Sequence, residues 1–191
     1  MLHRLRPRYP QASVVGLTLG LILWAQPLTP QNASLEYKVK AAFLFNFAKF
    51  VEWPSGAFSR PDAPFTICLA GDPFAGELER TIDGNTLNGR PLAVFRIGEG
   101  EPVRDCHMIY ISVPESRRSG DFIKAAANLP ILTVGEHEEF INAGGMIRFT
   151  QTGGRIRFEI NPEAAERASL KVSSRLLRLA DIVHPKRAGV P

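Results

Sequence analysis

Two short segments near the C-terminus, residues 146–150 and Arg155–Ile160, alternate apolar and polar side chains. Alternation with a period of two is typical of a β-strand that buries one face. Gly153 and Gly154 lie between the segments, and a glycine pair at this place favours a tight turn. The pattern therefore predicts an antiparallel β-hairpin. The charged residues that share its polar face are Arg148, Arg157 and Glu159.

A helix is predicted directly after the hairpin. Asn161 is a favourable N-cap, Pro162 suits the first helical position, and Glu163 suits the positive end of the helix dipole. From this cap, apolar residues recur at helical spacing as far as Val183. Residues 169–173, however, combine β-branched and capping residues, so one long helix and two helices broken at this point both fit the pattern.

An amphipathic helix is also predicted over residues 35–53, where apolar side chains recur at helical spacing. The Trp53-Pro54 step ends it, because the residue before a proline avoids helical geometry. Phe45 falls on the polar stripe of this helix. We expect another part of the domain to cover its ring, and contact with a partner or a second subunit is the alternative.

The middle of the chain alternates predicted strands with predicted helices. Such alternation implies crossover connections, hence a largely parallel sheet with helices on both faces. We predict a single three-layer α/β domain over residues 34–185, with a C-terminal β-hairpin, one or two final helices and a flexible tail at 186–191. The expected strands are 65–70, 91–97, 107–112 and 131–134, the helices 74–82, 115–129 and 136–142, and the loops 54–64 and 98–105.

The N-terminus has the pattern of a secretory signal peptide over residues 1–25. Three arginines precede an apolar run at residues 12–25, which suits a signal sequence and is short for a transmembrane helix. Cleavage after Ala25 or after Ala33 fits, and an uncleaved signal anchor is the alternative. Because no cysteine lies near either position, a lipid-anchored lipoprotein is not indicated. We expect an exported protein that does not insert into the membrane after cleavage.

Removal of this segment changes the charge balance. The whole chain carries 23 basic and 19 acidic residues, and three of the arginines lie in the signal segment. The mature chain is therefore nearly neutral. This gives no electrostatic reason to expect binding to nucleic acid or to an anionic membrane.

The chain has two cysteines, Cys68 and Cys106. An even number in an exported protein favours a disulfide, because the compartment is oxidising. Closing a loop of about 40 residues would stabilise the fold by roughly 4 kcal/mol in the chain-entropy model. Two buried free thiols are one alternative, and a redox switch, which would need a strained or exposed bond, is another.

No catalytic or metal-binding constellation emerges from the residues. The four histidines lack ligand spacing, a nucleophile elbow is absent, and the glycine pairs match neither phosphate-loop nor dinucleotide fingerprints. We therefore predict no catalytic residue, no metal and no cofactor. Gly144 and Gly145 allow a tight reversal and would leave backbone N–H groups uncovered. They serve either the turn alone or the docking of a small anionic or peptide group.

Several motifs together resemble the YfiR-like family of bacterial periplasmic proteins. They are AAFLFNFAKFVEWP at 41–54, GGMIRF at 144–149, RFEIN at 157–161, AAERA at 164–168 and SSRLLRLA at 173–180. The resemblance extends over residues 37–183. It implies a periplasmic, regulatory rather than enzymatic protein, and it favours a structural disulfide between Cys68 and Cys106. Family members commonly have glycine where this chain has Ser169, and serine makes a left-handed turn there less favourable.

The resemblance also implies a partner. The family includes a repressor of an inner-membrane diguanylate cyclase, so we expect binding to the periplasmic domain of a membrane sensor, either a diguanylate cyclase or a histidine kinase. Cyclic di-GMP and biofilm formation would be the outputs, and the family precedent allows a homodimer. A small-molecule-binding protein or enzyme that uses a cleft at the sheet edge, and a module of an envelope complex, are the alternatives. The predicted partner contacts are Phe45, Gly144, Gly145, Arg148, Arg157 and Glu159.

Overall fold

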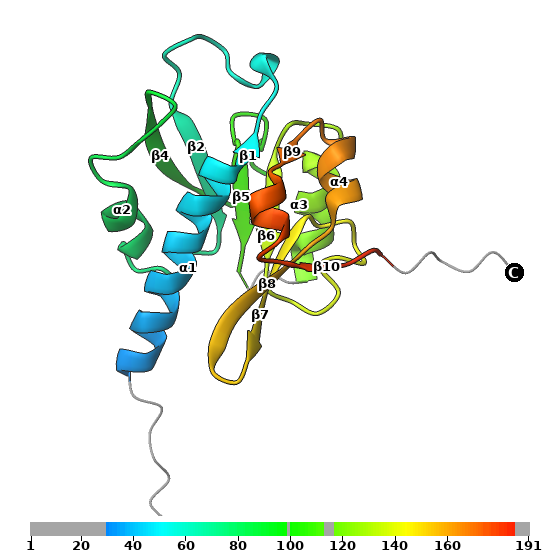
Figure 1. Cartoon of the computed structure of the whole chain (residues 1–191). Coiled ribbons are helices and arrows are strands. Elements are labelled where there is room, and N and C mark those ends of the chain that lie inside the picture. Colours follow the sequence, from blue (N-terminus) through cyan, green and yellow to red (C-terminus); the bar gives the residue numbers. More distant parts are fainter. Residues whose placement is uncertain (1–29, 99, 113–116, 186–191) are drawn as a thin grey trace, which may run out of the picture.

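The structure, a computed structural model, describes residues 30–98, 100–112 and 117–185 (Figure 1). The expected signal peptide at 1–25 and the tail at 186–191 lie outside these ranges. Among the helices within them, none combines the length and the hydrophobicity that crossing a membrane requires.

Eight strands form one mixed sheet in the order β10-β8-β7-β6-β5-β2-β4-β3. Strands β4, β2, β5, β6 and β7 run parallel to one another. Strand β8 pairs antiparallel with β7, β3 pairs antiparallel with β4, and β10 pairs parallel with β8. The predicted α/β class and the C-terminal hairpin are confirmed. The strands are β2 Phe65–Ala70, β3 Thr86–Leu87, β4 Arg90–Ile97, β5 Met108–Ile111, β6 Leu132–Gly135, β7 Ile147–Thr152, β8 Arg155–Ile160 and β10 Asp181–Ile182.

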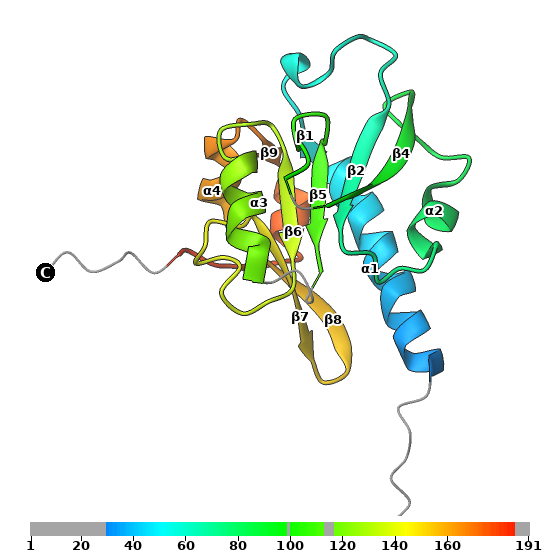
Figure 2. The same cartoon turned by 180° about the vertical axis from the view of Figure 1, so that it is seen from behind.

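Helices cover both faces of the sheet, which gives the three predicted layers (Figures 1 and 2). Helices α1 (Pro30–Phe50) and α2 (Glu77–Ile82) lie on one face, and α3 (Ser119–Ala126) lies on the other. Every residue of the central strands β2 and β5 is buried. Strands with both faces covered are apolar throughout, which explains their continuous hydrophobic sequence.

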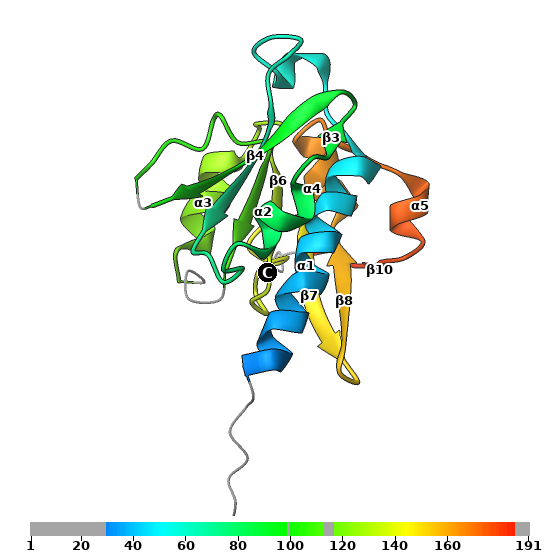
Figure 3. The ribbon, with the colours of Figure 1, turned by 90° about the vertical axis from the view of Figure 1, so that its left-hand side faces the viewer.

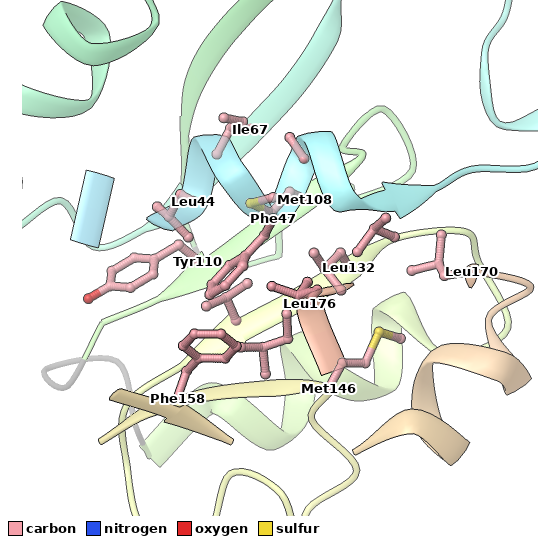
Figure 4. Packing of buried hydrophobic residues seen from close by; sticks show 14 of the residues in the cluster. Leu44, Phe47, Ile67, Met108, Tyr110, Leu132, Met146, Phe158, Leu170 and Leu176 are labelled. Carbon is pink, nitrogen blue, oxygen red and sulfur yellow. The ribbon is translucent and has the colours of Figure 1, made fainter. Parts of the chain in front are cut away.

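The larger hydrophobic core lies between α1, α2 and the sheet (Figure 4). Phe47 of α1 is fully buried and packs edge-on against Phe158 of β8, with ring centroids 5.0 Å apart. A second core lies under α3, where Phe122 and Ile123 face the opposite side of the sheet. The apolar period of the first helix therefore predicts its buried face correctly.

The N-terminal helix ends three residues earlier than the sequence predicts. Val51 and Glu52 leave the helix and form β1, which pairs antiparallel with β9 (Lys171–Val172). The N–H of Ser173 also donates to the carbonyl of Phe50 at 2.9 Å. The β-branched Val51 suits this extended geometry. The end of the first helix is thus tied to the C-terminal segment.

The C-terminal region consists of two helices, the second of the two arrangements that the sequence allows. Helix α4 (Pro162–Arg167) is followed by Ser169 in a left-handed conformation with φ of +59°. The N–H of Leu170 donates back to the carbonyl of Ala165 at 2.9 Å, which closes the helix end. Helix α5 (Ser174–Leu177) then begins after an N-cap serine. The break forms even though the left-handed residue is not glycine.

The predicted helix over residues 136–142 is wrong, because this segment forms turns. The ring of Phe140 is fully buried between two glycines. A Cβ atom on Gly135 would lie 2.4 Å from this ring, and one on Gly145 would lie 2.2 Å from it. The chain therefore wraps around the phenylalanine. The other two middle helices are shorter than predicted, and the pairing of β3 with β4 was not predicted.

Cys68 of β2 and Cys106 form a disulfide with a Cα–Cα distance of 5.8 Å. The expected pairing is therefore present in the structure. It joins a central strand to the loop that precedes β5. Both cysteines are buried, which shields the bond from solvent and favours the structural role over the redox switch.

His107 holds the loop at residues 54–64 against the sheet. Its Nδ1 accepts the N–H of Thr66 at 3.1 Å, so Nε2 carries the proton and donates to the carbonyl of Ala57 at 3.1 Å. The ring stacks between Phe58 and Phe65, with centroid distances of 4.4 and 5.2 Å. Burial lowers the pKa of His107. The histidine is therefore a neutral structural group.

Candidate partner-binding groove

A groove separates the N-terminal half of α1 from the β7–β8 hairpin, at the end of the molecule where both elements project from the body (Figure 1). It consists of two adjoining hollows of about 430 and 660 Å³. Glu36, Gln151 and Ile156 line both. Strand β7 pairs with β6 only at Ile147 and Arg148, so the rest of its edge is free to border the groove.

The outer hollow has an apolar strip, although Glu36, Gln151 and Arg155 also line it. Leu35, Val39 and Phe43 lie one helical turn apart on α1 and face Ile156 of the hairpin. Leu35 is 63% exposed and Val39 is 36% exposed, so both present apolar surface to solvent. The Phe43 ring is anchored against Phe158, with a centroid distance of 5.4 Å. This hollow can accept apolar side chains from another molecule.

The inner hollow contains a charged cluster built around Lys40. Its ammonium group is 2.5 Å from an oxygen of Glu36 and 2.7 Å from an oxygen of Glu136. The hydroxyl of Tyr110 donates to the other oxygen of Glu136. Tyr110 belongs to β5 and Glu136 follows β6, so the cluster lies at the carboxyl ends of parallel strands, where α/β sheets commonly bind their ligands.

Lys40 is charged although it is almost completely buried. Burial alone would lower the pKa of this ammonium, but the hydrogen bonds to Glu136 and Glu36 outweigh that effect and the pKa is raised. Burial also raises the pKa of the neighbouring Tyr37. Lys40 therefore has both carboxylates as fixed partners, and it positions α1 against the sheet.

Arg148 and Glu159 form the second charged feature of this region. They are direct cross-strand neighbours, as the hairpin pattern predicts. The guanidinium contacts one carboxylate oxygen through Nε at 2.8 Å and through a terminal nitrogen at 2.7 Å. It also donates to the carbonyl of Glu138 at 2.9 Å. Arg148 thus ties the turns after β6 to the hairpin and lines the inner hollow.

The other predicted contact residues do not gather at this groove. Arg157 is 3.6 Å from Asp181 of β10, and both side chains are more than half exposed. Phe45 is half-buried against the core, and the ammonium of Lys49 lies 5.1 Å from its ring centroid. As expected, the domain covers the Phe45 ring, but only in part.

Gly144 and Gly145 do not leave uncovered N–H groups, so that expectation is wrong. The N–H of Gly144 donates to the carbonyl of Ile141 at 3.0 Å, and that of Gly145 donates to Phe140 at 2.9 Å. Gly144 has a φ of +100°, which requires glycine. Gly145 is needed because the Phe140 ring leaves no room for a side chain. The pair serves the turn and its packing.

Sequence reasoning missed the cluster of Lys40, Tyr110 and Glu136, because its members lie far apart in the chain. Two signals were available. Glu36 and Lys40 have the i,i+4 spacing of a helical ion pair. Glu136 directly follows a buried strand, where a carboxylate is placed at the sheet edge. Among the described residues, no three His, Cys, Asp or Glu side chains are grouped as metal ligands would be.

The comparison with known families adds one finding. The protein-family model described as YfiR/HmsC-like matches residues 37–181. The match covers more than half of the chain and includes every strand of the main sheet except the last residue of β10. It also includes the groove and the charged cluster around Lys40, apart from Leu35 and Glu36, which precede the match.

Proposed function

Because the chain belongs to the YfiR/HmsC-like family, a periplasmic and regulatory family, we propose that it represses or modulates an inner-membrane signalling protein. The proposed partner is the periplasmic domain of a diguanylate cyclase, and a histidine kinase is the other sensor class that fits. The output would be the level of cyclic di-GMP, and through it biofilm formation. The observation that carries the proposal is the family match along the folded part of the chain.

The groove between α1 and the hairpin is the proposed contact surface. Contiguous exposed apolar surface marks interaction sites, and Leu35 and Val39 are exposed apolar neighbours one helical turn apart that border an apolar strip. Burying their exposed parts would contribute on the order of 2–3 kcal/mol to binding. If this contact forms with only one of the partner's two states, that amount corresponds to a shift of roughly 100-fold in the partner's equilibrium.

Charge indicates the chemistry of the occupant. Glu36 and Glu136 share one cation, Lys40, and Arg148 is held by Glu159. The exposed side chain of Glu138 makes no ion pair within the described part of the chain. The inner hollow is therefore lined by three carboxylates and two cations, whereas Arg155 adds a cation to the outer hollow. We expect a partner segment with apolar side chains for the outer hollow and a lysine or arginine for the inner one.

The partner responds only if this protein binds its two states with different affinity. A repressor must bind the inactive state more tightly. A segment that is ordered only in the inactive sensor and lies in the groove would satisfy this requirement. Signals that weaken the contact would then release the sensor.

The test is the level of cyclic di-GMP in the native bacterium, with the gene intact, deleted and restored. We expect the level to rise on deletion and to fall again with an exported copy, but not with a copy that lacks residues 1–25. An unchanged level on deletion would rule out control of a cyclase. Restoration by the copy without the signal would rule out periplasmic action.

A pair of matched variants tests the groove itself. Val39→Asp adds a carboxylate to the outer hollow and should fail to restore repression. Leu179→Asp changes a side chain that is 63% exposed outside the groove and should restore it. Equal periplasmic amounts of both variants, measured by immunoblot, exclude a folding defect. Full repression by Val39→Asp would show that the partner binds elsewhere.

A further inference from the structure

A pocket of about 210 Å³ lies between helices α3 and α4. Figure 2 shows these two helices side by side. The pocket forms where the two hydrophobic cores meet, because Ile123 lines it from the core under α3 and Met146 lines it from the larger core. A dry cavity of about 150 Å³ accommodates a benzene ring. This pocket therefore has room for one ring and a small polar group.

Small side chains create this space. Five alanines line the pocket. Ala126, Ala164 and Ala168 are buried in its walls, whereas Ala127 and Ala143 are exposed at its mouth. Protein interiors leave few voids larger than a water molecule. An apolar hollow of this size that opens to solvent is therefore a feature of a binding pocket.

Two cations, Lys124 and Arg167, lie at the mouth of the pocket. Lys124 belongs to the last turn of α3 and Arg167 ends α4, and both side chains are exposed. Neither side chain forms an ion pair or a hydrogen bond within the part of the chain that the structure describes. No aspartate or glutamate is among the described residues that line the pocket. The mouth therefore attracts a carboxylate and repels an ammonium group.

The inner end of the pocket offers hydrogen-bond donors. Thr133 is buried there, and its Oγ1 accepts the N–H of Met146 at 3.1 Å, so its hydroxyl can still donate. Asn161 is fully buried and is hydrogen-bonded to two residues that line the pocket, through its N–H to Met146 and through its Oδ1 to Ala164. Its Nδ2 group has no partner among the described residues. A buried donor without a protein acceptor is a place where a ligand oxygen can bind.

We propose that the pocket binds a small monocarboxylate with a single ring and an oxygen acceptor at the far end of that ring. The ring packs against the alanines, and the carboxylate lies between Lys124 and Arg167. The oxygen accepts hydrogen bonds from Thr133 and Asn161. An α-amino acid is a poor fit, since its ammonium group would meet two cations and no carboxylate. The ligand class is therefore a hydroxyaromatic acid.

This pocket is separate from the partner-binding groove. Helix α3, which forms one wall of the pocket, and α1, which forms one wall of the groove, lie on opposite faces of the sheet (Figure 3). A molecule in the pocket leaves the groove free. The proposed ligand does not depend on the proposed function.

Methionine methyl groups make the test specific. After the expected signal segment the chain has two methionines, of which Met146 lines the pocket and Met108 is fully buried in the larger core. The test titrates 4-hydroxyphenylacetate into the exported protein, labelled with methionine that carries a carbon-13 methyl group. We expect the NMR signal of Met146 to shift and that of Met108 to stay in place. Binding should saturate with a dissociation constant below about 1 mM.

Three related compounds test the ligand class. Tyramine has an ammonium group in place of the carboxylate and tyrosol has a neutral hydroxyl, so both should bind at least about 10-fold more weakly. Phenylacetate lacks the ring oxygen and should bind roughly 3-fold more weakly or worse. Equal affinity for tyrosol would show that the pocket recognises only the apolar ring, and equal affinity for phenylacetate would exclude the inner acceptor. Either result would overturn the proposal.

A pair of double variants locates the site. Lys124→Gln combined with Arg167→Gln should raise the dissociation constant by about 10-fold or more. Lys38→Gln combined with Arg155→Gln removes the same charge from exposed positions away from the pocket and should leave it unchanged. Equal effects of the two double variants would show that net charge, and not this pocket, attracts the acid.

A blocking variant tests the cavity. Ala127→Phe places a ring at the mouth of the pocket and should abolish the shift of the Met146 signal. An unchanged Met108 signal in this variant shows that the core is intact. The absence of a saturable Met146 shift in the wild type, or a shift that Ala127→Phe leaves unaltered, would overturn the proposal.

Discussion

Lys40 and Glu136 are separated by 96 positions in the chain, yet an ammonium nitrogen and a carboxylate oxygen lie 2.7 Å apart. The pair joins the N-terminal helix to the carboxyl end of β6. The Lys40 side chain is almost completely buried, and the Glu136 side chain is largely buried. This contact fixes one wall of the groove relative to the sheet, so its loss should affect both stability and binding.

Replacing Lys40 by methionine should lower the free energy of unfolding by about 3 kcal/mol, because Glu36 and Glu136 lose their shared cation in a partly buried site. Urea unfolding monitored by tryptophan fluorescence gives the value. Lys38→Met is the matched control on the same helix. Lys38 is more than half exposed and is 3.8 Å from Glu77, so we expect less than about 1 kcal/mol there. Equal effects of the two variants would contradict a structural role for the buried pair.

Acidification should destabilise the protein through His107. Its pKa is lowered in the folded state, first by burial and further by Arg90, while the hydrogen bond to Ala57 and the charge of Asp105 oppose the shift. The unfolded chain therefore binds a proton more readily. The stabilising contribution is present above the unfolded pKa of about 6.5 and is lost as the pH falls through the lower folded value.

Unfolding in urea at pH 7.5 and at pH 5.5 tests this expectation. His107→Gln should lower the stability at pH 7.5 and show a smaller further loss at pH 5.5 than the wild type. His184→Gln, which replaces an exposed histidine beside Glu163 near the C-terminus, is the control for the substitution itself. If His107→Gln loses as much stability on acidification as the wild type does, other groups cause the effect.

Removing the disulfide should destabilise the domain by about 2–5 kcal/mol, because it closes a long loop between β2 and β5. Cys68→Ala combined with Cys106→Ala provides the measurement in thermal or urea unfolding. In the native wild type, a mild thiol reductant should leave the bond intact, since both cysteines are buried. Rapid reduction without unfolding would instead support the redox switch.

Ser169→Gly should stabilise the protein by about 0.5–1 kcal/mol. The serine has a φ of +59°, which glycine adopts without the steric conflict of a Cβ atom. Ser169→Val should have the opposite effect, because a β-branched side chain is least suited to this conformation. A shift of the urea midpoint in the same direction for both variants would show that backbone conformation does not decide the effect.

Local sequence patterns predicted the parts of the fold that depend on neighbouring residues. The continuous apolar run of β2 gives a strand with the predicted bounds, and the Gly153-Gly154 turn gives the hairpin register that pairs Arg148 with Glu159. Asn161 caps α4 as its position predicts, since its side chain accepts the N–H of Ala164. In each case the determining contact lies within a few residues or across one turn.

The features that were missed depend on contacts between distant segments. Val51 lies outside the predicted helix because it pairs with Val172, and no local pattern contains that information. The helix predicted after β6 does not form, because Phe140 packs between Gly135 and Gly145. The inner hollow of the groove needs α1, the turns after β6 and the β7–β8 hairpin together, so its residues could not be grouped before the fold was known.

The pairing of β1 with β9 also bears on when the protein would fold during the predicted export. A chain exported through the predicted signal peptide would emerge from its N-terminal end, so α1 would emerge before its partners. Its buried phenylalanines need Phe149 and Phe158 of the hairpin, and Val51 needs Val172. During such export the core would be completed only after nearly the whole chain had been translocated, and until then the first helix would be a hydrophobic segment suited to a periplasmic chaperone.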